Sequence, residues 1–207
     1  DVPIVADAKL AIQKILEYAA PLKIEPWVDR LKEWKETYPI TMERYEGLTP
    51  EKIIKYIAEN YKRPIVATDV GQNQLWTTQF LELEGNRQLL TSGGLGTMGY
   101  GFPAAIGAKL GNPDADVFAI SGDGGMQMNI QEFATAVALE IPLTLIVLNN
   151  GYLGNVRQWQ QMLFDRRYSC TCLTYRRSCQ HNCMDPNKKC PKYSPDFVKL
   201  AESYDAY

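Results

Sequence analysis

Two long apolar runs near the middle of the chain predict buried β-strands. Residues 116–121 and 143–148 are almost entirely apolar, and each run is followed by the glycine, aspartate or asparagine residues that are typical of turns. Between them, residues 129–140 place apolar side chains at helical spacing. A strand, a helix and a strand in this order form a βαβ unit, in which the strands are parallel neighbours joined by a right-handed crossover. Because neither run has a polar face, both faces of the sheet should be covered. We therefore expect an α/β fold with a three-layer, doubly wound parallel sheet.

Shorter signals predict the other elements. Thr49 followed by Pro50 is typical of a helix start, with the hydroxyl as the N-cap and the proline in the first turn. Amphipathic spacing, prolines and short apolar runs give the remaining expectations: a strand end over 1–6, helices over 7–20, within 22–47, from 49 to about 61, over 71–82 and over 103–110, a strand over 64–68, and a last helix from 194 to 207. Both ends of the chain look cut from something longer.

Composition narrows the class of protein. The 207 residues are 45% hydrophobic and 22% charged, which is enough apolar chain to bury a core and excludes a disordered tail or a small disulfide-stapled scaffold. A formal net charge of −2 gives no overall attraction to nucleic acid or membrane. No apolar run approaches the ~20 residues of a membrane span, and no signal peptide is visible. All five cysteines lie between residues 170 and 190, so we expect a cytoplasmic protein rather than a secreted disulfide framework.

Candidate chemistry lies just beyond the two central strands. Asp123 follows one run and Asn150 follows the next, and ligands of a parallel sheet bind beyond the carboxyl ends of its strands. A carboxylate, an amide oxygen and a backbone carbonyl suit Mg²⁺, which takes its remaining oxygens from phosphate and water. Gly124 and Gly125 open the next helix with bare amides. The pattern favours a metal–diphosphate site, although each of these residue types is also common in ordinary turns.

A second glycine pattern gives a rival interpretation. Residues 94–99 read GLGTMG, which fits the GxGxxG fingerprint of nicotinamide dinucleotide sites, and an acidic residue follows at a suitable distance. That fingerprint must follow a buried strand directly, and residues 86–92 do not read as one. A nicotinamide-dependent oxidoreductase domain therefore stays as the alternative enzyme.

At this point the residues resemble a known family. The sequence GDG with NN about 25–30 residues later is the thiamine diphosphate motif, and residues 90–109 and 156–160 closely resemble the large, catalytic subunit of acetolactate synthase. The resemblance covers the whole chain except the cysteine-rich segment. It implies a thiamine-diphosphate-binding fold, with residues 1–47 as the tail of a middle domain and a linker, and 48–207 as the cofactor domain, truncated at its C-terminus and carrying an insertion at about 170–192.

The resemblance also implies a role for each matching position. Asp123 and Asn150 match the side-chain Mg²⁺ ligands, and Tyr152 supplies a carbonyl. Met98 matches the apolar wedge that bends the cofactor, and the carbonyl of Gly96 accepts from its amino group. The other cofactor neighbours are Val70, Gly71, Gln72, Asn73, Gly124, Gly125 and Met128, with Asn73 where the family usually has histidine. Val156 and Trp159 match the pocket for the second keto acid, beside Asn155 where methionine is more frequent.

The implied reaction decarboxylates pyruvate and adds the two-carbon unit to a second 2-keto acid, in branched-chain amino acid biosynthesis. The activating glutamate of the family lies on an N-terminal domain of a neighbouring subunit, so no catalytic residue is assigned in this chain and the isolated chain is expected to be inactive. The family also binds FAD, mostly on the middle domain. A homo-oligomer, at least a dimer, and a regulatory subunit are the implied partners, with no nucleic acid and no membrane.

The cysteine-rich segment is the feature that the resemblance does not cover. It contains Cys170, Cys172, Cys179, His181, Cys183 and Cys190, a candidate second metal site with irregular spacing. Disulfides and an unstructured, reduced loop are the alternatives. Seven basic residues between 166 and 192 also leave open a non-enzymatic binding module, for which a solvated loop is the ordinary interpretation.

Overall fold

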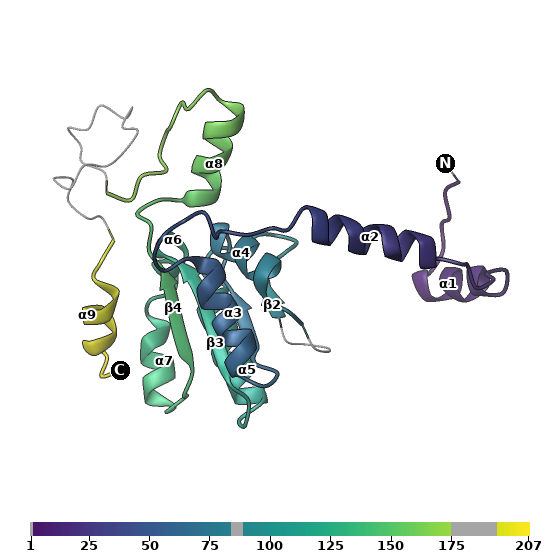
Figure 1. Cartoon of the computed structure of the whole chain (residues 1–207). Coiled ribbons are helices and arrows are strands. Elements are labelled where there is room, and N and C mark those ends of the chain that lie inside the picture. Colours follow the sequence, from purple (N-terminus) through teal and green to yellow (C-terminus); the bar gives the residue numbers. More distant parts are fainter. Residues whose placement is uncertain (1, 84–88, 175–193) are drawn as a thin grey trace. The chain divides into compact units, whose positions relative to one another are not determined.

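The computed structural model describes residues 2–83, 89–174 and 194–207, and it divides into two compact units, residues 1–41 and 42–207 (Figure 1). The first unit contains helices α1 (Ala8–Leu16) and α2 (Glu25–Thr37), neither of which has a buried residue. Within α2, Trp27 packs edge-on against Trp34 with ring centroids 5.7 Å apart. Residues 2–6 form no strand, so the strand end expected there is wrong. The domain boundary expected after residue 47 stays a prediction.

The second unit is built on a four-stranded parallel sheet. Its strands are β1 (Ile65–Thr68), β2 (Leu89–Thr91), β3 (Val117–Gly122) and β4 (Thr144–Leu148), in the order β2-β1-β3-β4. All three pairs are parallel. The two apolar runs of the sequence are β3 and β4, and they are neighbours, as the βαβ pattern predicts.

Helices cover both faces of this sheet. Helices α3 (Pro50–Asn60) and α4 (Gln72–Phe80) lie on one face, where Ile54, Ile57 and Phe80 pack with β1 and β3. Helices α5 (Gly101–Gly111), α7 (Glu132–Ala138) and α9 (Phe197–Glu202) contribute to the core on the other face. The predicted three-layer α/β fold is confirmed, and α3 begins with Thr49 as its N-cap, as expected. No helix among the described residues is long and apolar enough to cross a membrane.

Several boundaries differ from the predictions. Residues 89–91, which we did not expect to include a strand, form β2, whose residues are half-buried. The helix expected over 129–140 is shorter, and it is preceded by a separate turn of helix, α6 (Asp123–Met126). The last helix ends at Glu202 and not at Tyr207. Asp205 has a φ of 60°, and the amide of Ala206 donates back to the carbonyl of Ala201, which terminates the helix in a left-handed cap.

Candidate functional site

The site lies where the strand order reverses, beyond the carboxyl ends of β1 and β3. In open α/β sheets this is where ligands bind, since the connections leave a crevice there. The end of β1 leads into Asp69 and Val70, and the end of β3 leads into Asp123. Gly122 is in register with Leu148 of β4, so the loop that carries Asn150 lies beside Asp123. The sequence-based expectation that these two side chains meet at one edge is confirmed.

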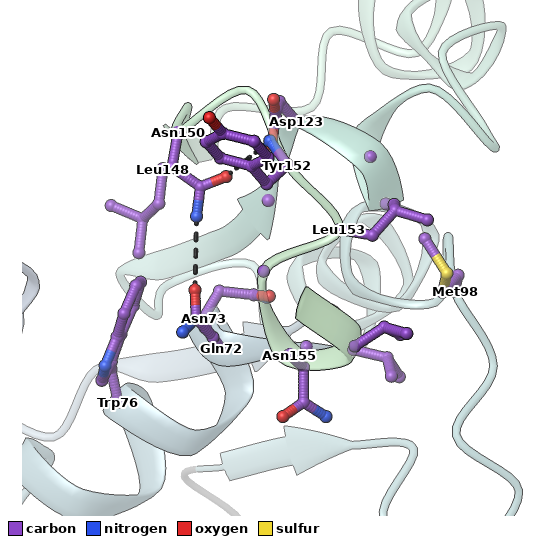
Figure 2. Close-up of a pocket in the computed structure, with 17 residues that line it drawn as sticks. Gln72, Asn73, Trp76, Met98, Asp123, Leu148, Asn150, Tyr152, Leu153 and Asn155 are labelled. Atoms are coloured by element: carbon purple, nitrogen blue, oxygen red, sulfur yellow. Dashed lines mark hydrogen bonds between the residues drawn. The ribbon is translucent and has the colours of Figure 1, made fainter. Parts of the chain in front are cut away.

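A pocket with an empty volume of ≈ 570 Å³, partly open to solvent, occupies this edge. Figure 2 shows Asn150 and Tyr152 beside Asp123 on one side of it and Met98 beside Leu153 on another. The lining consists of residues 70–73, Trp76, Met98, residues 122–125, Leu148, Asn150 and residues 152–156.

Asp123 is the acidic group of this pocket. Its side chain is 1% exposed, and one carboxylate oxygen, Oδ2, accepts a hydrogen bond of 2.9 Å from the amide of Gly151. Burial raises the pKa of Asp123 above its ordinary value, while hydrogen bonds from backbone amides, that of Gly151 foremost, act to lower it. A buried carboxylate with this imbalance gains from a bound cation, and oxygen donors of this kind fit Mg²⁺.

Asn150 is held in place beside Asp123, on the same side of the pocket. Its Oδ1 accepts a 2.9 Å hydrogen bond from the amide of Tyr152, and its Nδ2 donates to Oε1 of Gln72 at 3.3 Å. Gly151, between Asn150 and Tyr152, has a φ of 75°, a backbone conformation that would be strained in a residue with a side chain. The turn therefore brings Asn150 and the backbone of Tyr152 to the side of Asp123.

Asn73 has a clear local role. Its side chain is 3% exposed, and Nδ2 donates to the backbone carbonyls of Asp69 at 2.9 Å and Ile120 at 3.1 Å. These bonds join the ends of β1 and β3 directly beneath the pocket. Asn73 lines the pocket, but its amide nitrogen is committed to the backbone.

Most of the residues singled out from the sequence come together here. Those that line the pocket are Val70, Gly71, Gln72, Asn73, Met98, Asp123, Gly124, Gly125, Asn150, Tyr152, Asn155 and Val156. Gly96, Met128 and Trp159 are not among its lining residues. Gly96 has a φ of 64° and lies close to Val70, whereas Met128 and Trp159 are 53% and 51% exposed. Leu153, Trp76 and Leu148 are lining residues that the sequence analysis did not single out.

Asp69 is the main residue that the sequence analysis missed. It is 1% exposed, it follows β1 directly, and its carboxylate accepts hydrogen bonds from the amides of Val70, Gly99 and Gly101. A polar residue placed immediately after a buried strand is the same signal that identified Asp123, and it was present in the sequence at this position too.

Helix α8 (Gly154–Leu163) follows the loop of Asn150, and residues 168–174, here called the strap, pair with that loop. Leu153 donates its amide to the carbonyl of Thr171, and Leu173 donates to that of Gly151, on either side of an antiparallel bridge between residues 152 and 172. The guanidinium of Arg157 stacks between the rings of Tyr152, at 4.2 Å, and Tyr168, at 3.7 Å. The loop beside Asp123 is thus fixed from two directions.

The expected second metal site falls largely outside the described residues, because Cys179, His181, Cys183 and Cys190 lie there. Cys170 is exposed and Cys172 half-buried, and both are free thiols. Within the described residues no group of three cysteine, histidine or acidic side chains is placed to hold a metal. The metal, disulfide and unstructured alternatives for this segment stay predictions.

Comparison with known proteins gives a family match over most of the chain. The family model described as "Thiamine pyrophosphate enzyme, C-terminal TPP binding domain" matches residues 69–207. The chain is 40% identical to the probable acetolactate synthase large subunit of Methanocaldococcus jannaschii over 99% of its length, which covers 33% of that protein. It is also 40% identical to the acetolactate synthase large subunit of Corynebacterium glutamicum, over 98% of this chain and 31% of that protein.

A solved structure shares the fold. The thiamine diphosphate-dependent 4-hydroxybenzoylformate decarboxylase of Rhodococcus jostii RHA1 superimposes with a TM-score of 0.59 and 23% identity, over 80% of this chain and 27% of that one. The chain spans about a third of the length of the curated relatives it matches. The resemblance stated from the sequence is therefore confirmed for the family and for the fold.

Proposed function

The chain belongs to the thiamine pyrophosphate enzymes, whose C-terminal cofactor-binding domain it contains, and we propose that it is part of an acetolactate synthase large subunit. The proposed reaction decarboxylates pyruvate and joins the two-carbon unit to a second 2-keto acid, for branched-chain amino acid biosynthesis. The observation that carries the proposal is the position of Asp123 beside Asn150. Both follow the carboxyl ends of neighbouring strands, β3 and β4, and both line one pocket with residues 70–73.

In the proposed cofactor site, one group of pocket residues holds the metal ion and another holds the diphosphate. Mg²⁺ would be held by Asp123, Asn150 and the backbone carbonyl of Tyr152, and the diphosphate would lie against Gly71, Gln72 and Gly124. Gly124 suits this position, since a Cβ there would lie 2.6 Å from Leu153, and the bare backbone lets that loop approach closely. When bound, thiamine diphosphate supplies an electron sink for the carbanion that decarboxylation produces.

The remaining pocket residues bind and shield. Met98, Val70 and Leu153 give apolar walls on the side away from Asp123, and these would shield the part of the cofactor that lies there from water. Val156 lies at the end of the pocket on α8, where we propose that it contacts the second keto acid, with Trp159 one turn further along. None of the glutamates in the described residues lines the pocket, so the group that handles the proton on the pyrimidine is proposed to come from another domain.

The same proposal covers the domain boundaries, the second cofactor, the subunit partners and the cellular location of the whole protein. Residues 1–47 correspond to the end of a middle domain and a linker, and 48–207 to the cofactor domain. FAD bound mainly on the middle domain, a homo-oligomer, a regulatory subunit and a cytoplasmic location complete the proposed enzyme. Similarity to large subunits along nearly the whole chain supports these assignments.

The amides of the glycine-rich loop argue against the nicotinamide alternative. A dinucleotide fingerprint offers its backbone N–H groups to the pyrophosphate. Here the amide of Gly96 donates to the carbonyl of Ser92, that of Thr97 to the hydroxyl of Ser92, and that of Gly99 to Asp69. The loop is therefore bound to the protein itself at the positions that such a ligand requires.

Calorimetric titration of thiamine diphosphate, with and without Mg²⁺, tests the proposal. We expect binding that requires Mg²⁺, and its loss in Asp123→Ala, because the substitution removes the charged metal ligand. Asn150→Ala should weaken binding less, since it removes a neutral one. Asp116→Ala is the matched control, an exposed aspartate directly before β3 at the opposite edge of the sheet, and it should bind as the wild type does. No heat with the wild-type chain under either condition would contradict the proposal.

A further inference from the structure

The carboxylate of Asp69 accepts hydrogen bonds from the backbone amides of two segments that are distant from each other in sequence. Oδ1 accepts from the amide of Val70 at 2.8 Å and from that of Gly99 at 3.1 Å, and Oδ2 accepts from Gly101 at 3.0 Å. The side chain is 1% exposed. Hydrogen bonds to a charged acceptor in a buried setting are among the stronger ones in proteins, so this carboxylate ties the glycine-rich loop firmly to the end of β1.

The slot around the carboxylate is shaped by two glycines. A Cβ on Gly125 would lie 2.1 Å from Oδ1 of Asp69, and a Cβ on Gly101 would lie 2.5 Å from its backbone nitrogen. Both contacts are too short for any side chain, and one of the two involves rigid backbone. The starts of α5 and α6 are therefore packed directly against this aspartate.

What Asp69 positions is one wall of the pocket. Asp69 itself does not line the pocket, but Val70, its neighbour in the chain, and Met98, the neighbour of Gly99, both do. On the opposite side of the pocket, Asp123 and Asn150 accept from the amides of Gly151 and Tyr152, and neither of these two amides donates to the Asp69 side chain. The hydrogen bonds of the carboxylate thus come from the segments that carry Val70 and Met98, and not from the loop of Asn150.

From this geometry we infer that Asp69 is a positioning residue for the ring portion of the cofactor. Its carboxylate sets the distance between Val70 and Met98, because it accepts hydrogen bonds from the amide of Val70 and from that of Gly99, the residue after Met98. The inference rests on the proposed function, since it takes thiamine diphosphate as the ligand. It requires that the rings, and not the diphosphate, lose their contacts when Asp69 is changed.

Two ligands separate these contributions in the full 207-residue chain. We compare the affinities of thiamine diphosphate and inorganic pyrophosphate, both with Mg²⁺, for wild type and Asp69→Asn. Asparagine has nearly the same shape as aspartate, but only one of its two terminal atoms can accept a hydrogen bond. Its NH₂ group would face a backbone N–H group, and two donors cannot bond to each other. We expect thiamine diphosphate to bind about tenfold more weakly, as for loss of a buried charged hydrogen bond, and pyrophosphate to be affected less than about twofold.

Amide hydrogen exchange gives an independent readout without ligand. The amides of Gly99 and Gly101 should exchange faster in Asp69→Asn, while the amide of Ile65, which donates to Asp116 at the other end of the sheet, should keep its protection. Thr77→Val is the matched control. Thr77 is fully buried on α4 and its hydroxyl donates to the carbonyl of Asn73, so it reports the effect of losing a buried polar group near β1 without touching the loop.

The outcomes are distinguishable. If wild type binds neither ligand, the proposed function fails and the inference falls with it. If wild type binds both and Asp69→Asn weakens both by the same factor, or neither, the function stands and the positioning role is overturned. Equal exchange rates at Gly99 and Gly101 in the two proteins would also overturn it. A selective loss for thiamine diphosphate in Asp69→Asn, absent in Thr77→Val, supports the inference.

Discussion

Two buried aspartates at the ends of neighbouring strands have different roles because their oxygens have different partners. Both oxygens of Asp69 accept from backbone amides, so the polar needs of this side chain are met within the protein. Asp123 accepts from the amide of Gly151, and burial dominates, raising its pKa. At the scale of single residues, the carboxylate of Asp69 therefore holds two backbone segments together, and the carboxylate of Asp123 is the one that a bound cation would stabilise.

The raised pKa of Asp123 predicts a pH dependence of stability in the metal-free protein. Its folded-state pKa lies above the unfolded one, so the folded state takes up the proton more readily. The contribution of Asp123 to the free energy of unfolding is therefore fully present below the unfolded pKa and is lost as the pH rises through the folded pKa. We expect the free energy of unfolding of wild type, minus that of Asp123→Asn, to increase as the pH falls from neutral towards the ordinary range of aspartate.

Urea unfolding at a series of pH values, in the presence of a chelator, measures this difference. The other carboxylates titrate alike in both proteins and cancel. Adding Mg²⁺ should reverse the sign of the trend, because the metal binds the ionised form. A difference that stays constant with pH in the chelated protein would show that burial of Asp123 has no net cost.

At the scale of elements, patterns contained in a segment's own residues were predicted from the sequence, and features that depend on distant residues were not. The apolar runs of β3 and β4 and the cap of α3 are visible in the sequence. Strand β2 has only three residues and is stabilised by pairing with β1, which the local sequence cannot show. Helix α8 begins at Gly154 without a side-chain cap, so no start signal marks it.

The site follows the same division. Asp123 and Asn150 were predictable because each follows a strand and the two strands are adjacent. Asp69 has the same local signal, but its meaning depends on amides 30 and 32 residues away, which only the folded chain brings near. The strap is a third case, since a single bridge between residues 152 and 172 leaves no periodic pattern.

The strap gives a prediction at this scale. Leu173→Pro removes the amide that donates to the carbonyl of Gly151, and Leu173→Ala keeps it while losing the same side chain. We expect Mg²⁺-dependent binding of thiamine diphosphate to be about 3- to 10-fold weaker in the proline variant than in the alanine variant, the effect of about one hydrogen bond. Isothermal titration of the two proteins measures it, and equal affinities would mean that the strap does not hold the metal loop.

For the whole molecule, we expect the purified 207-residue chain to form no acetolactate from pyruvate beyond what free thiamine diphosphate and Mg²⁺ produce. The described residues place no glutamate in the pocket, and positioned acid–base groups typically contribute about 10²–10⁴-fold. A product assay with the chain, the cofactor and the metal tests this against a chain-free control. Robust turnover would show that a residue of this chain handles the pyrimidine proton.

The strand order β2-β1-β3-β4 has a consequence for how the protein is made. Strand β1 is synthesised first but lies inside the sheet, so one of its edges has no partner until residues 117–120 leave the ribosome. The crevice is completed later still, when the turn that carries Asn150 emerges. A ligand stabilises only a state that it can bind, so the cofactor cannot assist the nascent chain until β4 and that turn are in place. Until then the apolar strands depend on other shielding, by helices α3 and α4 or by a chaperone.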